Sequence, residues 1–281
     1  MPSNERIAEY SMKATGMGIS EIAITEHLFR FKQSLSLLNT VVARESNVEM
    51  ADSMKAYFNF HATMDLDQYV ESIQVAKNAG LPVRLGLEVD YYRGSMDEVS
   101  TMLSGYPFDV ILGSIHWLGT WRFDDLDDPL SMGQWGVVSP DAVWMAYEEA
   151  MKELTETDAC DVIAHPDLIK VHGEKPPMNS EFWSIMADIL SKSGMTVEVS
   201  SAGWRKPVGE QYPAVELLAE LARRGVPFTT ASDAHTLSLV GDQMDKLRAM
   251  LIDVGVTSVR SFSTRVARDI DISQESTIES A

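Results

Sequence analysis

The stretch ISEIAITEH (residues 19–27) sets the fold prediction, because a short apolar run in it ends directly in polar side chains. Residues 22–24 are apolar and mostly β-branched, which favours a buried strand. Glu26 and His27 stand where that strand is expected to end. Such a strand either stops at a polar surface or presents ligands, and the rest of the chain decides between these two interpretations.

The same pattern of an apolar run with a polar end recurs along the chain. The later runs span residues 83–92, 108–118, 160–170, 195–204 and 226–235, and one more short strand is predicted at 257–262. Segments with apolar residues at helical spacing span residues 66–80, 139–154, 179–194, 212–225 and 241–255. Strands that are apolar throughout and alternate with helices indicate an α/β protein with a parallel sheet buried on both faces.

The domain organisation is predicted to be simple. A length of 281 residues is usual for a single α/β barrel, and no Pro-, Gly- or Ser-rich linker divides the chain. We expect one domain over residues 1–268, followed by an acidic, polar tail over residues 269–281.

The charge and the cysteine content narrow the possible partners. A net charge of −19 argues against duplex nucleic acid or an anionic membrane as the main partner, because both need a cationic surface. A small anionic substrate remains compatible, since bound metal ions reverse the local field. Cys160 is the only cysteine, and no apolar run approaches the length of a membrane span or follows the pattern of a secretory signal. The cytoplasm is therefore the expected compartment, and the oligomeric state is left open.

Histidines and carboxylates gather at the predicted strand ends. In parallel α/β folds the carboxyl ends of the strands meet at one edge and carry the functional side chains. Taken singly, each could be a hydrogen-bonded histidine, a salt-bridge partner or a helix cap. Taken together they predict a metal centre for Zn, Mn or Fe, because an all-oxygen Mg or Ca site would not use so many imidazoles. The candidate metal ligands are His27, Glu88, His116, His165, Asp233 and His235.

Six motifs in order resemble the polymerase-and-histidinol-phosphatase (PHP) superfamily, and more narrowly its histidinol-phosphatase branch. They are TEH (25–27), GLEVDY (86–91), GSIHW (113–117), AHPDL (164–168), SSAGWRKPVGEQYP (200–213) and SDAH (232–235). The resemblance runs from about residue 4 to residue 240. It implies a distorted, TIM-like, seven-stranded (β/α) barrel that holds two or three divalent metal ions.

The resemblance also implies a role for each candidate ligand. Glu88 would be the bridging carboxylate, and His116 with His165 would complete one metal site. Asp233 would serve a second metal, and His27 with His235 a third. The implied activity is metal-dependent phosphomonoester hydrolysis, with L-histidinol phosphate as the favoured substrate and histidine biosynthesis as the setting.

Substrate binding and proton transfer are assigned to a smaller set of residues. Arg205 matches a family position that binds the substrate phosphate, and a bidentate guanidinium suits a phosphate. Asp233 and His235 are the candidates for passing a proton to the leaving alkoxide. Arg30 and Arg122 are second-choice phosphate contacts.

One departure from the family pattern concerns its first strand, which carries a His-x-His pair. No histidine precedes His27, and residues 4–18 have the pattern of a helix. Three explanations stay open: a start placed too far downstream, a chain that is a fragment, or a strand that is truly absent. Two alternatives to histidinol-phosphate hydrolysis follow: a PHP phosphoesterase for another substrate, nucleotides included, or an impaired remnant that binds metal or anion without turnover.

Other histidines and aromatic residues lie away from the predicted strand ends. His61 and His172 are interpreted as loop histidines, with His172 also within possible reach of substrate. Trp117, Trp121 and Trp135 follow His116 and either form a pocket wall or pack within the loop.

Overall fold

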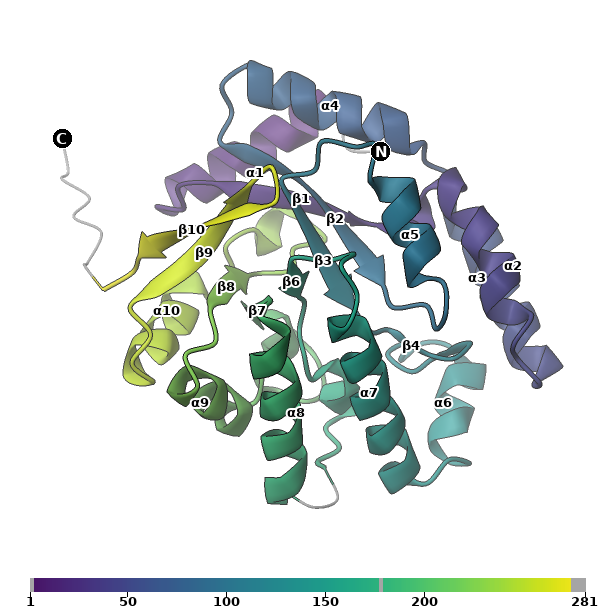
Figure 1. The fold of residues 1–281 in the computed structure, drawn as a ribbon. Helices are drawn as coiled ribbons and strands as arrows, with labels where there is room; N and C mark the ends of the chain where they lie inside the picture. Colours follow the sequence, from purple (N-terminus) through teal and green to yellow (C-terminus); the bar gives the residue numbers. More distant parts are fainter. Residues whose placement is uncertain (1–2, 177–178, 274–281) are drawn as a thin grey trace.

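Six parallel strands form the centre of the molecule in the computed structural model, which describes residues 3–176 and 179–273 (Figure 1). In spatial order they are β1 (Ile22–His27), β2 (Val83–Asp90), β3 (Val110–Ser114), β6 (Val162–Ile163), β7 (Thr196–Ser200) and β8 (Phe228–Ala231). Every neighbouring pair is parallel, so all six carboxyl ends lie at one edge of an open half-barrel. The predicted α/β class is confirmed, and each of the six main apolar runs contains one of these strands.

Helices pack around the outside of the sheet (Figure 1). They are α1 (Asn4–Gly16), α2 (Leu35–Val42), α3 (Val48–His61), α4 (Leu66–Asn78), α5 (Met96–Leu103), α6 (Pro129–Trp135), α7 (Pro140–Thr155), α8 (Asn179–Ser193), α9 (Val215–Arg223) and α10 (Met244–Asp253). Asn47, Asp65 and Asp128 cap α3, α4 and α6 by accepting backbone N–H bonds. Among the described residues, no helix combines the length and the apolarity that crossing a membrane requires.

Short elements connect the strand ends to these helices. They are the 3₁₀ helices η1 (Leu28–Arg30), η2 (Lys32–Ser34), η3 (Leu168–His172), η4 (Ala202–Arg205) and η5 (Leu237–Leu239), and the paired strands β4 (Trp117–Leu118) and β5 (Trp121–Arg122). Because η1, η3 and η4 follow β1, β6 and β7, they begin at the edge of the sheet where the candidate ligands lie.

The short strand predicted at 257–262 is confirmed, but it does not join the central sheet, which has six strands and not the seven that the resemblance implied. Residues 258–263 form β9 (Ser258–Ser263), which pairs antiparallel with β10 (Val266–Asp271) and not with the central sheet. Thr264 and Arg265 both have positive φ, so a two-residue turn sends the chain straight back beside itself. The predicted boundary at residue 268 therefore falls inside β10, and residues 274–281 of the predicted tail lie outside the described residues.

Within residues 3–176 and 179–273, no strand pairs with the outer edges of β1 and β8, and a cavity lies between them. The cavity measures about 950 Å³ and is bordered by both edge strands and by β9. A small apolar cluster that is separate from the main core lies along it: Val110, Leu112, Val162, Ala164 and Phe262. The β9–β10 hairpin is tied to the start of β1 by ion pairing of Arg268 with Glu21 at 2.8 Å. The half-barrel is thus open between its first and last strands.

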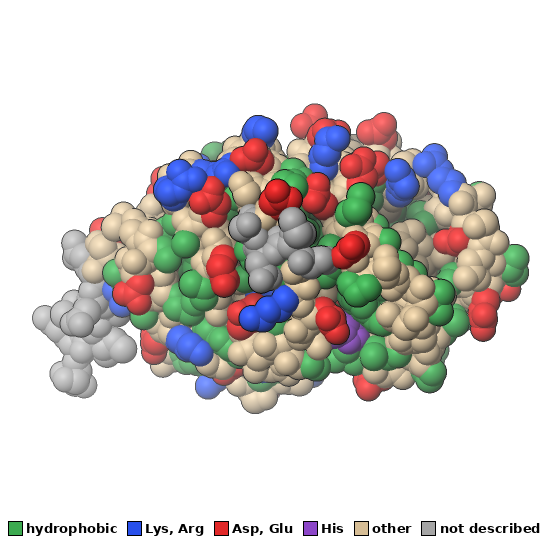
Figure 2. All heavy atoms as spheres, turned by 90° about the horizontal axis from the view of Figure 1, so that it is seen from below, with side chains coloured by type: hydrophobic (Ala, Val, Ile, Leu, Met, Phe, Trp, Pro, Cys, Tyr) green, Lys and Arg blue, Asp and Glu red, His purple; other side chains and the backbone are tan. Residues whose placement is uncertain are grey.

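Charges of both signs are interspersed on the molecular surface. On the face shown in Figure 2, Lys and Arg side chains lie singly or in small groups among Asp, Glu and apolar side chains. The net charge of −19 is therefore spread over the surface seen there and not gathered in one block.

Candidate metal centre

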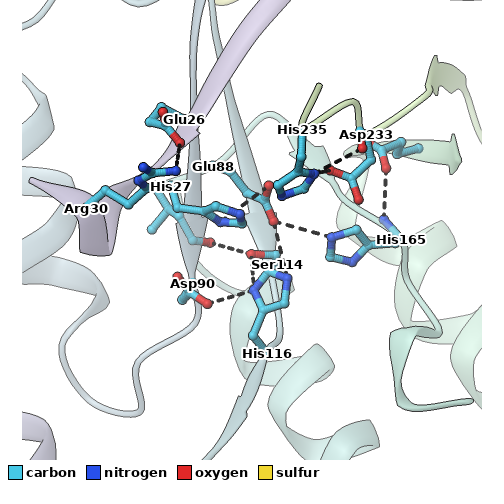
Figure 3. Close-up of polar contacts among 12 residues, drawn as sticks. Glu26, His27, Arg30, Glu88, Asp90, Ser114, His116, His165, Asp233 and His235 are labelled. Atoms are coloured by element: carbon cyan, nitrogen blue, oxygen red, sulfur yellow. Dashed lines mark hydrogen bonds and ion pairs between the residues drawn. The ribbon is translucent and has the colours of Figure 1, made fainter. Parts of the chain in front are cut away.

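Four of the six candidate ligands lie at the carboxyl ends of four parallel strands (Figure 3). His27 is the last residue of β1 and stands directly beside Glu88 of β2 in the strand register. His116 follows β3, and His165 follows β6. Strand direction alone places these side chains together, because parallel neighbours end at the same edge.

Glu88 is the centre of this group. Its Oε1 atom lies 3.3 Å from His165 Nε2 and 3.6 Å from His116 Nε2, and its Oε2 atom lies 3.6 Å from His27 Nδ1. The residue is only 6% exposed. One buried carboxylate is therefore shared by three imidazoles that come from three different strands.

The spacing and the unsatisfied atoms fit a metal ion. Glu88 Oε1 and His27 Nδ1 are buried and have no hydrogen-bond partner among the described residues. Ligands about 2.1 Å from a tetrahedral metal lie about 3.4 Å apart, which agrees with the separations around Glu88 Oε1. One potential ligand atom from each of Glu88, His116 and His165 lies within 4.8 Å of the others. These three residues have the donor types and the closeness that a Zn, Mn or Fe site needs.

Asp90 is a site residue that the sequence prediction missed. It is fully buried, and its Oδ1 atom lies 2.7 Å from His116 Nδ1. A second three-residue group of potential ligands contains His27, Asp90 and His116. We assign Asp90 to orientation, because a proton shared between His116 Nδ1 and Asp90 leaves Nε2 directed at Glu88, as in carboxylate–histidine–metal arrangements. The alternation in GLEVDY, which puts Glu88 and Asp90 on one face of β2, was the available signal.

The charge balance of the site couples metal binding to protons. Burial lowers the pKa of His116, but the charges of Asp90 and Asp124 outweigh it and raise that pKa to about 10. Burial raises the pKa of Glu88, and the surrounding imidazoles, His27 first, bring it well below the usual range. At neutral pH the ionised carboxylate of Glu88 thus lies beside a protonated His116.

Metal binding is expected to release protons at pH 7. His116 must lose its proton before Nε2 can coordinate, so the affinity for a divalent metal should rise with pH until about pH 10. Calorimetry in two buffers of different protonation enthalpy measures the proton count. Asp90→Asn should reduce that count, because it removes the main charge that raises the pKa of His116. Identical heats in the two buffers would contradict the prediction.

Asp233 and His235 lie beside this group on the loop after β8 (Figure 3). His235 Nδ1 is 3.5 Å from Asp233 Oδ1, and the ring centroids of His235 and His27 are 6.1 Å apart. The His235 side chain is 63% exposed. Among the described residues, neither belongs to a group of three potential ligands as close as the one around Glu88. The structure thus brings all six predicted ligands to one rim but packs only part of them tightly.

Glu198, in the middle of β7, is a second residue that the sequence prediction passed over. It is 3% exposed, and burial raises its pKa to about 7. Its Oε1 accepts a hydrogen bond from the backbone N–H of His165 at 3.3 Å. A glutamate inside the apolar run MTVEVSS was the signal that could have revealed it.

The secondary candidates lie around the rim in identified contacts. Arg30 pairs with Glu26 at 3.3 Å. The Arg122 guanidinium lies 4.2 Å from the ring centroid of Tyr57, whose ring is also 4.2 Å from that of His61. His61 is the last residue of α3. It was interpreted as a loop histidine because the sequence pattern did not predict that helix.

The aromatic loop after His116 packs against itself and against α3 and η3. Trp117 and Trp121 are buried in the β4–β5 pair. Trp135 stacks edge-on against His172 at 4.7 Å, and His172 Nε2 lies 2.8 Å from the carbonyl oxygen of Phe123. Of the two interpretations of these tryptophans, packing is the one these contacts support.

The parallel half-barrel places the protein in the α/β class. The histidines and carboxylates at its strand ends form a site of the kind that binds divalent metal ions. The model of the family described as PHP domain matches residues 1–202. The chain therefore belongs to the PHP domain family. A protein from Deinococcus radiodurans named probable histidinol-phosphatase is 30% identical over 258 residues, covering 89% of this chain and 88% of that protein. The histidinol-phosphatase of Bacillus subtilis is 23% identical, with coverages of 85% and 90%.

Solved structures share the fold. A putative histidinol phosphatase from Listeria monocytogenes superimposes with a TM-score of 0.67 at 20% identity, covering 85% of this chain and 93% of that one. A histidinol phosphate phosphatase from Lactococcus lactis, solved with zinc, L-histidinol and phosphate, gives 0.64 at 15% identity, with coverages of 93% and 92%. At these identities the likeness establishes the architecture alone.

Proposed function

We propose that the protein is a metal-dependent phosphomonoesterase that hydrolyses L-histidinol phosphate to L-histidinol and phosphate. The observation that carries the proposal is the buried group of Glu88, His116 and His165, in a PHP-family chain whose relative of 30% identity is named probable histidinol-phosphatase. The related Lactococcus structure with zinc, L-histidinol and phosphate supports a small phosphate ester as substrate.

The residues of the rim would have different roles in this reaction. Glu88, His116 and His165 would hold the tightest metal, and His27, Asp233 and His235 would contribute to one or two more. A divalent Zn, Mn or Fe ion bound there would supply Lewis acidity, which activates water and neutralises charge on the phosphoryl oxygens. Asp90 keeps His116 Nε2 directed at the site. Asp233 or His235 would protonate the leaving alkoxide. The phosphate contact predicted for Arg205 stays a prediction, and the phosphate-inhibition experiment described below tests it.

The expected result of a direct assay is phosphate release from L-histidinol phosphate by the metal-reconstituted protein. Removal of the metal with a chelator should abolish the release, and adding back Zn, Mn or Fe should restore it. Glycerol phosphate and a nucleoside monophosphate serve as comparison substrates, because their hydrolysis at equal efficiency would favour a PHP phosphoesterase of another specificity. Metal binding without release from any of the three would contradict the proposed activity.

A metal- or anion-binding protein without turnover is the second candidate. The observation that favours it is the open gap between β1 and β8, which borders His27, Asp233 and His235. These three residues alone provide few ligands for a second or third metal, and closed metal sites usually have four.

A further inference from the structure

The Arg205 side chain is directed at the loop that carries Asp233. Its Nη2 donates to the carbonyl oxygens of Ser232 at 2.6 Å and of Asp233 at 3.3 Å. Its Nη1 donates to Asp242 Oδ2 at 2.9 Å. The two terminal nitrogens therefore face protein acceptors, whereas a phosphate contact would use these same donors.

The hydrogen bonds to the two carbonyls hold both peptide groups that flank Asp233. Asp233 has φ +48°, in the left-handed region that a residue with a Cβ rarely adopts. Such a conformation persists when the surrounding structure fixes it. Because the Ser232 and Asp233 carbonyls belong to the peptide groups before and after the Asp233 Cα, Arg205 fixes the backbone angles that direct the Asp233 carboxylate.

Asp242 is also held through its backbone. Its carbonyl oxygen accepts a hydrogen bond from Ser201 Oγ at 2.8 Å. The preceding residue, Gly241, donates its N–H to Ser232 Oγ at 3.3 Å. The turn that carries Asp242 is thus tied both to the residue after β7 and to the Asp233 loop, and its carboxylate fixes the direction of the guanidinium.

We propose that Arg205 and Asp242 form a positioning pair that holds Asp233 in the conformation presented to the metal rim. Asp242 orients Arg205, and Arg205 locks the two peptide groups around Asp233. Neither residue then needs to touch the substrate. The inference rests on the proposed function only in that Asp233 contributes to a metal site.

Cobalt(II), added at a concentration that also fills the weaker sites of the rim, tests this pair without relying on turnover. Asp242→Asn keeps the side-chain shape but removes the charge that orients Arg205. Arg205→Lys removes the guanidinium, which contacts Asp242 with one nitrogen and the two carbonyl oxygens with the other. Both variants should change the visible spectrum of bound Co(II) in the same direction as Asp233→Asn. Partners that orient a ligand typically contribute about 10- to 100-fold to metal affinity or activity, so a loss of that size is expected. Asp253→Asn, an exposed carboxylate on α10, is the matched control and should leave the spectrum unchanged.

Inhibition by inorganic phosphate separates positioning from substrate contact. A positioning pair predicts that kcat falls in both variants while the inhibition constant for phosphate stays within about twofold, since no phosphate ligand is lost. A tenfold rise of that constant in Arg205→Lys, with an unchanged spectrum in Asp242→Asn, would overturn the pair. If Asp233→Asn itself leaves the Co(II) spectrum unchanged, both the pair and the metal role of Asp233 fail. If wild-type protein has no phosphatase activity but the spectra shift as expected, only the proposed function fails.

Discussion

Replacing Glu88 by glutamine should remove tight metal binding and lower any phosphatase activity on the order of 10³-fold or more. The carboxylate is shared by His27, His116 and His165, so its loss removes the acceptor common to all three. Glutamine keeps the side-chain shape but is neutral, and a neutral amide cannot balance a buried divalent cation. Elemental analysis after dialysis gives the metal content, and phosphate release from L-histidinol phosphate gives the activity.

The control for this experiment is Glu98→Gln on the exposed face of α5. It makes the same chemical change away from the rim, so metal content and activity should equal those of the wild type. A Glu88→Gln protein that folds and keeps its full metal content would show that the group around Glu88 is not the metal site.

Filling the gap between β1 and β8 is expected to have the second large effect. Without an added strand, the chain is expected to hold at most one metal tightly, through Glu88, His116 and His165. The cavity of about 950 Å³ is bordered by both edge strands, so we expect an added strand to enter it beside them. Both edge strands that border it have free backbone groups to pair with.

The experiment adds a segment of alternating apolar residues with a His-x-His pair, joined to the N-terminus by a flexible linker. Its imidazoles would reach the rim beside His27 and His235, so metal content should rise to two or three and activity by roughly 10²-fold. The control segment carries Ala at both His positions; it should raise the thermal stability by covering the apolar cluster but leave the metal content unchanged. Two or more tightly held metals per chain in the unextended protein would contradict the prediction.

Local sequence patterns were sufficient for the strands and for most of the rim. The run ISEIAITEH predicted both β1 and the position of His27, because a β-branched run and its polar end depend only on neighbouring residues. The rule that parallel strands end together then brought His27, Glu88, His116 and His165 to one edge. Each of these predictions needs only short-range periodicity and one general property of parallel sheets.

The tertiary structure decided what depends on contacts between distant segments. Asp90 is a buried partner of His116, 26 residues away, and Arg205 is bound to Asp242, 37 residues away. Residues 257–262 had a strand pattern, but that pattern does not say which strand is the partner. The two-residue turn at Thr264 and Arg265 pairs the observed strand β9 with β10. The sequence by itself thus determined where the six strands lie and that His27, His116 and His165 stand at strand ends. Only the folded chain determined that Asp90 orients the His116 imidazole and that Asp242 binds the Arg205 guanidinium. It also determined that the sheet stays open between β1 and β8, because strand pairing and burial depend on the whole arrangement.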